Sequence, residues 1–164
     1  LPPGSLDRYA QTADQFYTNR PDSLSGIVYT VDGFGSKADD TADGNVDGTA
    51  LVIVHNPLYD PRDWDPDHPQ YSTSEAAAKR ADPTTYGPAE LGNINGGTFK
   101  GIIIADKVDK IDGNVTIYGS VISLSGVDES IIGAGTATLR YSCQAIEALA
   151  NGMQAARRLA WVAE

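Results

Sequence analysis

Apolar residues occur along this chain mostly in short bursts separated by glycine, asparagine and aspartate. Near the N terminus they recur instead at helical spacing after Ser5, a candidate N-cap, at Leu6, Tyr9, Ala10, Ala13, Phe16 and Tyr17. This pattern predicts an N-terminal helix over residues 5–18. The first strands are expected within residues 25–55, where SGIVYT and TALVIVHN are rich in β-branched residues.

Two kinds of apolar burst alternate over residues 97–141. GIIIAD begins at Gly101 and GSVISL at Gly119, while IDGNVTIY begins at Ile111 and a similar run at Ile131. Each kind recurs after about twenty residues, an interval typical of one coil of a solenoid. Glycine and the Asp-Gly-Asn step suit the corners, because tight turns require positive φ.

We therefore expect a mainly β protein with flanking helices, built as a short right-handed parallel β-helix. In it, Ile102 and Ile104, or Ile103, stack on Val121 or Ile122 of the next coil. The alternative is a β-sandwich of hairpins, because Asp112-Gly113 between apolar runs is also a hairpin signal.

A second helical pattern begins at Ser142 and extends over residues 142–163. Ser142 is a candidate cap, and the apolar stripe includes Ile146, Leu149 and Met153. A bare coil end would expose unpaired backbone, so this helix is expected to cap the solenoid by facing its final coil.

The segment over residues 56–96 is rich in proline and aspartate and reads as an insertion laid on the scaffold. Within it, STSEAAAKRA predicts a short helix with Ser72 or Ser74 as its cap.

The composition is that of a single domain spanning residues 1–164, with a net charge of -10. This charge argues against nucleic acid and anionic lipid as partners. Cys143, the single cysteine, is expected to be a small buried apolar residue. No apolar run is long enough to span a membrane, and a start without methionine suggests that any membrane anchor lies upstream.

The region from Gly97 to the helix at Ser142 resembles the C-terminal region of PilX-like type IV pilus assembly proteins. The matching positions are Phe99, Gly101, Gly113, Asn114, Tyr118, Gly119 and Tyr141. The insertion at 56–96 and the missing N-terminal membrane helix depart from that family. The resemblance implies a structural protein of a pilus or cell envelope without catalytic residues.

Calcium is the one metal that the residues suggest. Asp43, Asn45 and Asp47 stand at alternate positions in DGNVDG, which copies the first half of a calcium-binding loop. Position twelve of such a loop would be Val54 rather than glutamate, so a further carboxylate must come from elsewhere. The competing interpretation is a solvated acidic turn.

Catalytic patterns are weak. There is no G-x-S-x-G motif, and His55 and His68 are expected to be polar loop residues. Asp60, Asp63, Asp65 and Asp67 lie near Trp64 and Tyr71, as in glycosidases, but are crowded into one loop.

We therefore expect a non-enzymatic, extracytoplasmic protein of pilus or envelope assembly that acts through protein–protein contacts. A calcium-stabilised adhesin-like or carbohydrate-binding module is the alternative, and a polysaccharide-active β-helix enzyme is third.

Overall fold

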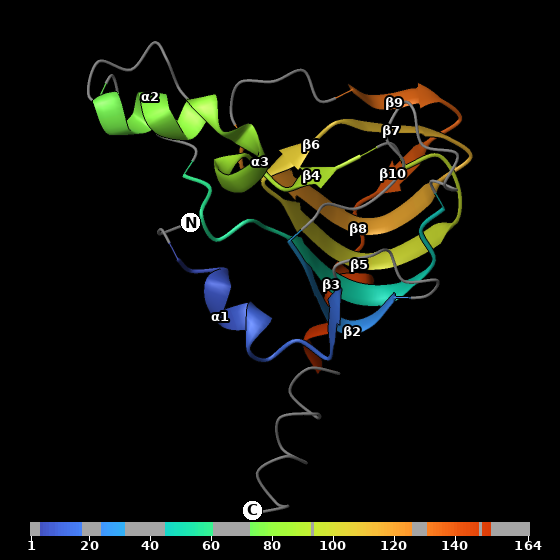
Figure 1. Cartoon of the computed structure of the whole chain (residues 1–164). Helices are drawn as coiled ribbons and strands as arrows, with labels where there is room; N and C mark the ends of the chain where they lie inside the picture. The colour runs from blue at the N-terminus through green and yellow to red at the C-terminus, as the bar shows by residue number, and fades with distance from the viewer. Residues whose placement is uncertain are drawn as a thin grey trace, which may run out of the picture.

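A parallel sheet of six strands forms the centre of the computed structural model, which describes residues 4–17, 24–31, 45–60, 73–92, 94–125, 131–147 and 149–151. Its strands lie in chain order across the sheet (Figure 1): β1 (Gln15–Tyr17), β2 (Leu24–Thr30), β3 (Gly48–Val54), β5 (Thr98–Ala105), β8 (Thr116–Ser123) and β10 (Thr138–Arg140). A strand-rich chain with parallel pairing was predicted, and this is confirmed.

Two smaller sheets are built from the short strands between these long ones. β4 (Glu90–Leu91) pairs with β6 (Lys107–Val108), and β7 (Lys110–Gly113) pairs with β9 (Ile131–Gly135). An isolated parallel bridge joins Ile94 to Ile111. Every pair of described strands is parallel. The hairpin at Asp112-Gly113 is therefore wrong, since β7 and β8 each pair with a different strand.

The large sheet is apolar on both faces, which is usual for parallel strands. In β3, Ala50, Val52 and Val54 point into the main core, whereas Leu51 and Ile53 belong to a second cluster on the opposite face. The main core also contains residues of the short strands, namely Leu91, Val108 and Ile111. The long and short strands thus share one interior.

The register between β5 and β8 agrees with the prediction for Ile103 and Ile104 but not for Ile102, which lies opposite Ser120. Ile103 lies opposite Val121, Ile104 opposite Ile122, and Gly101 opposite Gly119. Both glycines have positive φ, +137° and +146°. A Cβ on Gly119 would overlap the carbonyl oxygen of Gly101, so the backbones approach closely at this position.

The N-terminal helix predicted over residues 5–18 is wrong in its second half. Helix α1 spans only Asp7–Ala10, and Gln15–Tyr17 form β1 on the edge of the sheet. Ser5 is not its cap, because the N-cap position is Leu6 and carries no side-chain cap bond. Pairing with β2 satisfies the backbone of Gln15–Tyr17 and overrides helical propensity. The apolar stripe still packs on the second cluster, through Leu6, Tyr9, Ala10 and Ala13.

The segment predicted as an insertion contains helices α2 (Ser74–Ala81) and α3 (Pro83–Tyr86). The cap of α2 is Thr73, whose Oγ1 accepts a hydrogen bond from Ala76 N at 3.1 Å, and not Ser72 or Ser74. The predicted boundary at residue 96 is also wrong, because Ala89, Leu91 and Ile94 are buried in the main core. Leu91 belongs to β4, which pairs with β6, and Ile94 forms the isolated bridge with Ile111.

The helix after Ser142 is present at residues 143–147 and 149–151, and Ser142 Oγ accepts from Ala145 N at 3.2 Å as predicted. Leu149 does not face the final coil, however. It packs with Leu6, Tyr29, Leu51 and Ile53, because the outward face of β2 and β3 is apolar and requires cover. Cys143 is exposed, which contradicts its expected burial. Met153 and the rest of the stripe lie outside the described residues. None of the helices within the described ranges is long and apolar enough to span a membrane.

Candidate functional site

The predicted calcium ligands are only partly within the described residues. Asp43 lies outside them, while Asn45 forms an isolated bridge with Gly96. Asp47 Oδ1 accepts a hydrogen bond from Thr98 N at 2.9 Å, and its carbonyl accepts from Leu24 N at 3.1 Å. Asp47 therefore holds the starts of β2 and β5 in the sheet. Calcium binding by Asp43, Asn45 and Asp47 remains a prediction.

The second acidic cluster lies almost entirely outside the described residues, as does His68. Only Asp60 of its four carboxylates is described. Across the described segments, no group of three or more His, Cys, Asp or Glu side chains could hold a metal ion.

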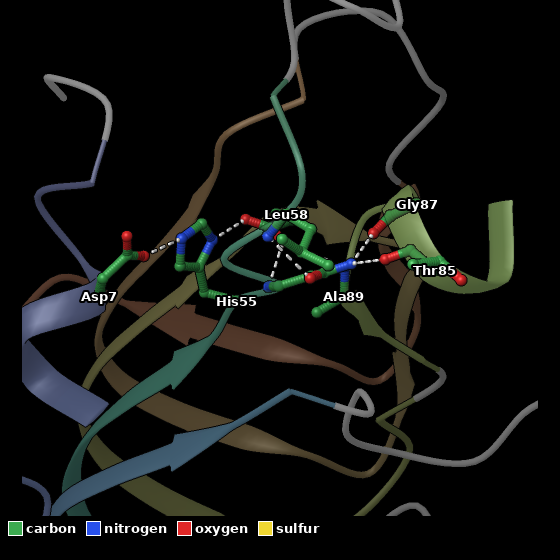
Figure 2. A network of polar contacts seen from close by, with 8 residues as sticks. Asp7, His55, Leu58, Thr85, Gly87 and Ala89 are labelled. Carbon is green, nitrogen blue, oxygen red and sulfur yellow. Dashed lines mark hydrogen bonds and ion pairs between the residues drawn. The ribbon is translucent and has the colours of Figure 1, made fainter. Parts of the chain in front are cut away.

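The most concentrated polar chemistry in the described residues surrounds His55, which follows directly after β3. Its side chain is 11% exposed. Nδ1 lies 2.6 Å from Asp106 Oδ1, and Nε2 lies 3.0 Å from Asp7 Oδ1 (Figure 2). The Tyr29 ring stands edge-on to the imidazole, with centroids 6.4 Å apart. The expectation of a polar loop histidine is therefore wrong for His55.

Asp106 is fully buried, and both of its carboxylate oxygens have partners. Oδ1 faces His55, while Oδ2 accepts the backbone N–H groups of Asn56 at 2.8 Å and Ala89 at 3.1 Å. All of these partners donate, which suits an ionised carboxylate, an acceptor at both oxygens. Burial of a charge is tolerated when hydrogen bonds compensate it in this way. Asp106 thus joins the ends of β3 and β5 to the segment before β4.

Asn56 extends the network to the neighbouring helix (Figure 2). Its Nδ2 donates to the carbonyls of Thr85 at 3.0 Å and Gly87 at 2.8 Å, and its Oδ1 accepts from Leu58 N at 3.0 Å. The polar network therefore runs from α1, through the end of β3, to the end of α3.

Electrostatics favours a charged His55. Burial of the ring lowers the pKa of His55, but the hydrogen bonds and charges of Asp106 and Asp7 outweigh burial, so the pKa lies above its ordinary value of 6.5. Burial, and then the charges of Asp7 and Asp106, raise the pKa of Tyr29, which stays a neutral phenol at physiological pH.

The hydrogen bonds around His55 and Asp106 connect α1, the end of β3, the end of α3 and the segment before β4. A histidine general base needs a free nitrogen that faces a nucleophile or substrate. Here Asp106 and Asp7 face both ring nitrogens, so the ring is not placed to take a proton from serine or cysteine. Comparisons with protein-family models, curated proteins and solved structures each gave no match.

Reasoning from the sequence missed Asp7 and Asp106 as partners of His55, although a signal for Asp106 was present. His55 follows the apolar run ALVIV, and Asp106 follows GIIIA. The two runs pair in register up to Val54 and Ala105, so the next residue of each strand lies side by side. The contact between His55 and Asp106 therefore follows once β3 is known to pair with β5 in this register.

Proposed function

We propose that the chain winds as a right-handed parallel β-helix and serves as a non-enzymatic structural module of a pilus or cell envelope, outside the cytoplasm. The solenoid is supported by the parallel register that continues from β2 through β3 and β5 to β8. It is also supported by the short strands, which recur between the long ones and share the same core.

The observation that supports the assembly role is at the edge of the large sheet formed by its last two strands, β8 and β10. Here β10 is shorter than β8 and leaves a step along the edge. β10 pairs only with residues 116–118 of β8. The remainder of β8, residues 119–123, pairs with β5 on one side and with no described strand on the other. Such an edge is a template for an added strand from another chain.

Apolar side chains are exposed around this step. Ile122 on β8 is 42% exposed, Leu139 on β10 is 44% exposed, and Tyr141 is 73% exposed. Leu139 lies opposite Ile117, and Ile122 lies five residues further along β8, so these exposed side chains are spread along the edge that no described strand pairs. Exposed apolar side chains along such an edge suit an interaction surface. The assembly surface, as we define it, consists of residues 119–123, Leu139 and Tyr141.

The opposite edge of the sheet is protected. β1 pairs only with Val28–Thr30 of β2. In the rest of β2, the N–H of Ser25 donates to Gln15 Oε1 at 3.2 Å, and the N–H of Ile27 donates to Asp14 Oδ2 at 2.8 Å. Head-to-tail stacking of two copies is therefore disfavoured, and a net charge of -10 on each copy opposes self-association. The occupant we propose is an extended strand of a different, neutral or basic envelope protein.

Photo-cross-linking in intact cells tests this function. A benzophenone amino acid replaces Ile122 in one variant and Leu58, which is 55% exposed and remote from the step in sequence, in a control variant. We expect the Ile122 position, and not the Leu58 position, to cross-link to an envelope or pilus component that mass spectrometry identifies. Leu139→Asp in the Ile122 background should abolish the product and leave the melting temperature unchanged.

A different pattern of products would overturn the proposal. Cross-links between two copies of this chain would identify self-association instead. Equal products from both positions, or products that persist with Leu139→Asp, would show that the assembly surface has no specific partner.

A further inference from the structure

A contact between Asp7 and His55 joins helix α1 to the end of strand β3. Asp7 lies in the first turn of α1, and its side chain is 44% exposed. It reaches His55 Nε2, whereas the buried Asp106 holds Nδ1 on the other side of the ring (Figure 2). Among the described residues, the ionisable groups that face His55 are these two carboxylates and the Tyr29 phenol.

The two ring nitrogens differ in how readily each gives up its proton. Without a donor at Nδ1, the fully buried Asp106 would keep its charge and lose one of its three partners, which is costly. Asp7 can instead turn toward water. The neutral ring therefore keeps the proton at Nδ1 and presents a lone pair at Nε2 to the carboxylate of Asp7, which repels it.

Helix α1 covers apolar residues of the sheet. Leu6 is buried with Tyr29, Leu51 and Ile53 on the outward face of β2 and β3, and Tyr9, Ala10 and Ala13 pack against the same cluster. Figure 1 shows α1 beside these two strands. The chain after α1 is held separately, because β1 pairs with β2. Detachment of Asp7 would thus leave residues 4–13 held over this face by their apolar packing alone.

We propose that Asp7 and His55 form a charge-dependent latch that holds α1 over the outward face of the sheet and opens when His55 loses its proton. The latch is a regulatory device in addition to the assembly surface, and it lies on a different part of the fold. It makes the part of the cover that α1 provides over Tyr29, Leu51 and Ile53 depend on pH, whereas Leu149 covers the same cluster independently.

The direction of the pH effect follows from linkage. The folded protein binds the His55 proton more tightly than the unfolded chain does. The stabilisation by the latch is therefore fully present below the ordinary histidine pKa of 6.5, and it is lost as the pH rises through the pKa of folded His55. Low pH therefore closes the latch, and a rise of the pH through the pKa of folded His55 opens it.

Proton NMR of the His55 ring tests the coupling, with His68→Gln as the background so that one histidine is observed. We expect a titration midpoint above 6.5 that falls clearly in Asp7→Asn. Glu75→Gln is the matched control, because it removes one negative charge from a side chain that is 81% exposed and remote from His55 in sequence. That variant should leave the midpoint unchanged.

Trypsin cleavage after Arg8 in α1 tests the opening. The rate in the wild type is divided by the rate in His55→Gln, which has the same cleavage sequence and no titratable ring. This ratio should rise between about pH 6 and about pH 9, by about tenfold for each pKa unit by which closure of the latch raises the pKa of His55. A midpoint at or below 6.5, equal midpoints in Asp7→Asn and Glu75→Gln, or a ratio that is constant with pH would each overturn the latch.

Discussion

Among single residues, Asp106 combines complete burial with three hydrogen bonds from separate parts of the chain. Its donors are the His55 ring and the backbone N–H groups of Asn56 and Ala89. The residue follows the apolar run of β5 and so enters the interior where the neighbouring strands end. Its carboxylate substitutes for the water that these buried donors would otherwise require.

We predict that Asp106→Ala lowers the free energy of unfolding by about 3–5 kcal/mol, because it leaves two backbone donors and the His55 cation without their acceptor. Urea denaturation measures the loss. Asp109→Ala is the control, since this nearby aspartate is exposed and should change stability by less than about 0.5 kcal/mol. Equal effects of the two substitutions would contradict the assigned role of Asp106.

Among the elements, the end of β10 explains why the assembly surface exists. Continuing the register of β10 with β8 would place Tyr141 opposite Gly119, which itself lies opposite Gly101. Both glycines adopt positive φ at this column, because a side chain would meet the carbonyl of the previous strand. The same column continues through Ala50 and Gly26 on the other side of Gly101. Tyrosine beside Gly119 would not readily adopt the positive φ of the two glycines. β10 ends at Arg140, and residues 119–123 pair with no described strand on that side.

The glycine column makes a stability prediction. Gly119→Ala should cost about 1–3 kcal/mol or more, because it combines an unfavourable φ of +146° with overlap on the carbonyl of Gly101. Ser120→Ala, one residue along the same strand, should cost far less. Thermal unfolding of both variants provides the comparison. A Gly119→Ala protein as stable as the wild type would show that the strands do not approach as closely as described.

For the whole molecule, the acidic charge bears on both association and metal binding. A net charge of -10 disfavours self-association and favours cations as stabilising ligands. Asp47 already uses its carboxylate to hold Thr98 N, so calcium would have to share that oxygen or use the second one. Calcium binding near Asp43, Asn45 and Asp47 would therefore couple a surface loop to the starts of β2 and β5.

We predict that millimolar calcium raises the melting temperature relative to chelator. Calcium at about one hundred times its dissociation constant would stabilise the native state by about 2.7 kcal/mol. Asp43→Asn should remove the shift without disturbing the bond from Thr98 N to Asp47. Differential scanning calorimetry measures the melting temperatures, with magnesium as the control ion. Identical melting temperatures in calcium and chelator would refute the calcium prediction.

The sequence by itself indicated a strand-rich chain and the parallel alignment of β5 with β8. Glycines at Gly101 and Gly119, each followed by β-branched residues, predicted the pairing of Ile103 with Val121. Ser142 predicted the start of its helix. These features are local, because backbone freedom at glycine, strand propensity and capping depend on a few neighbouring residues.

Tertiary structure decided the features that depend on contacts between distant segments. Residues Gln15–Tyr17 continue a helical pattern yet become β1, because the edge of β2 offers hydrogen bonds to their backbone. Leu149 packs on β2 and β3 because their outward face is apolar, which the helical stripe does not reveal. The sequence predicts a polar loop histidine at His55, and only the pairing of β3 with β5 brings Asp106 beside it. Burial and charge pairing depend here on residues about fifty positions apart in the chain.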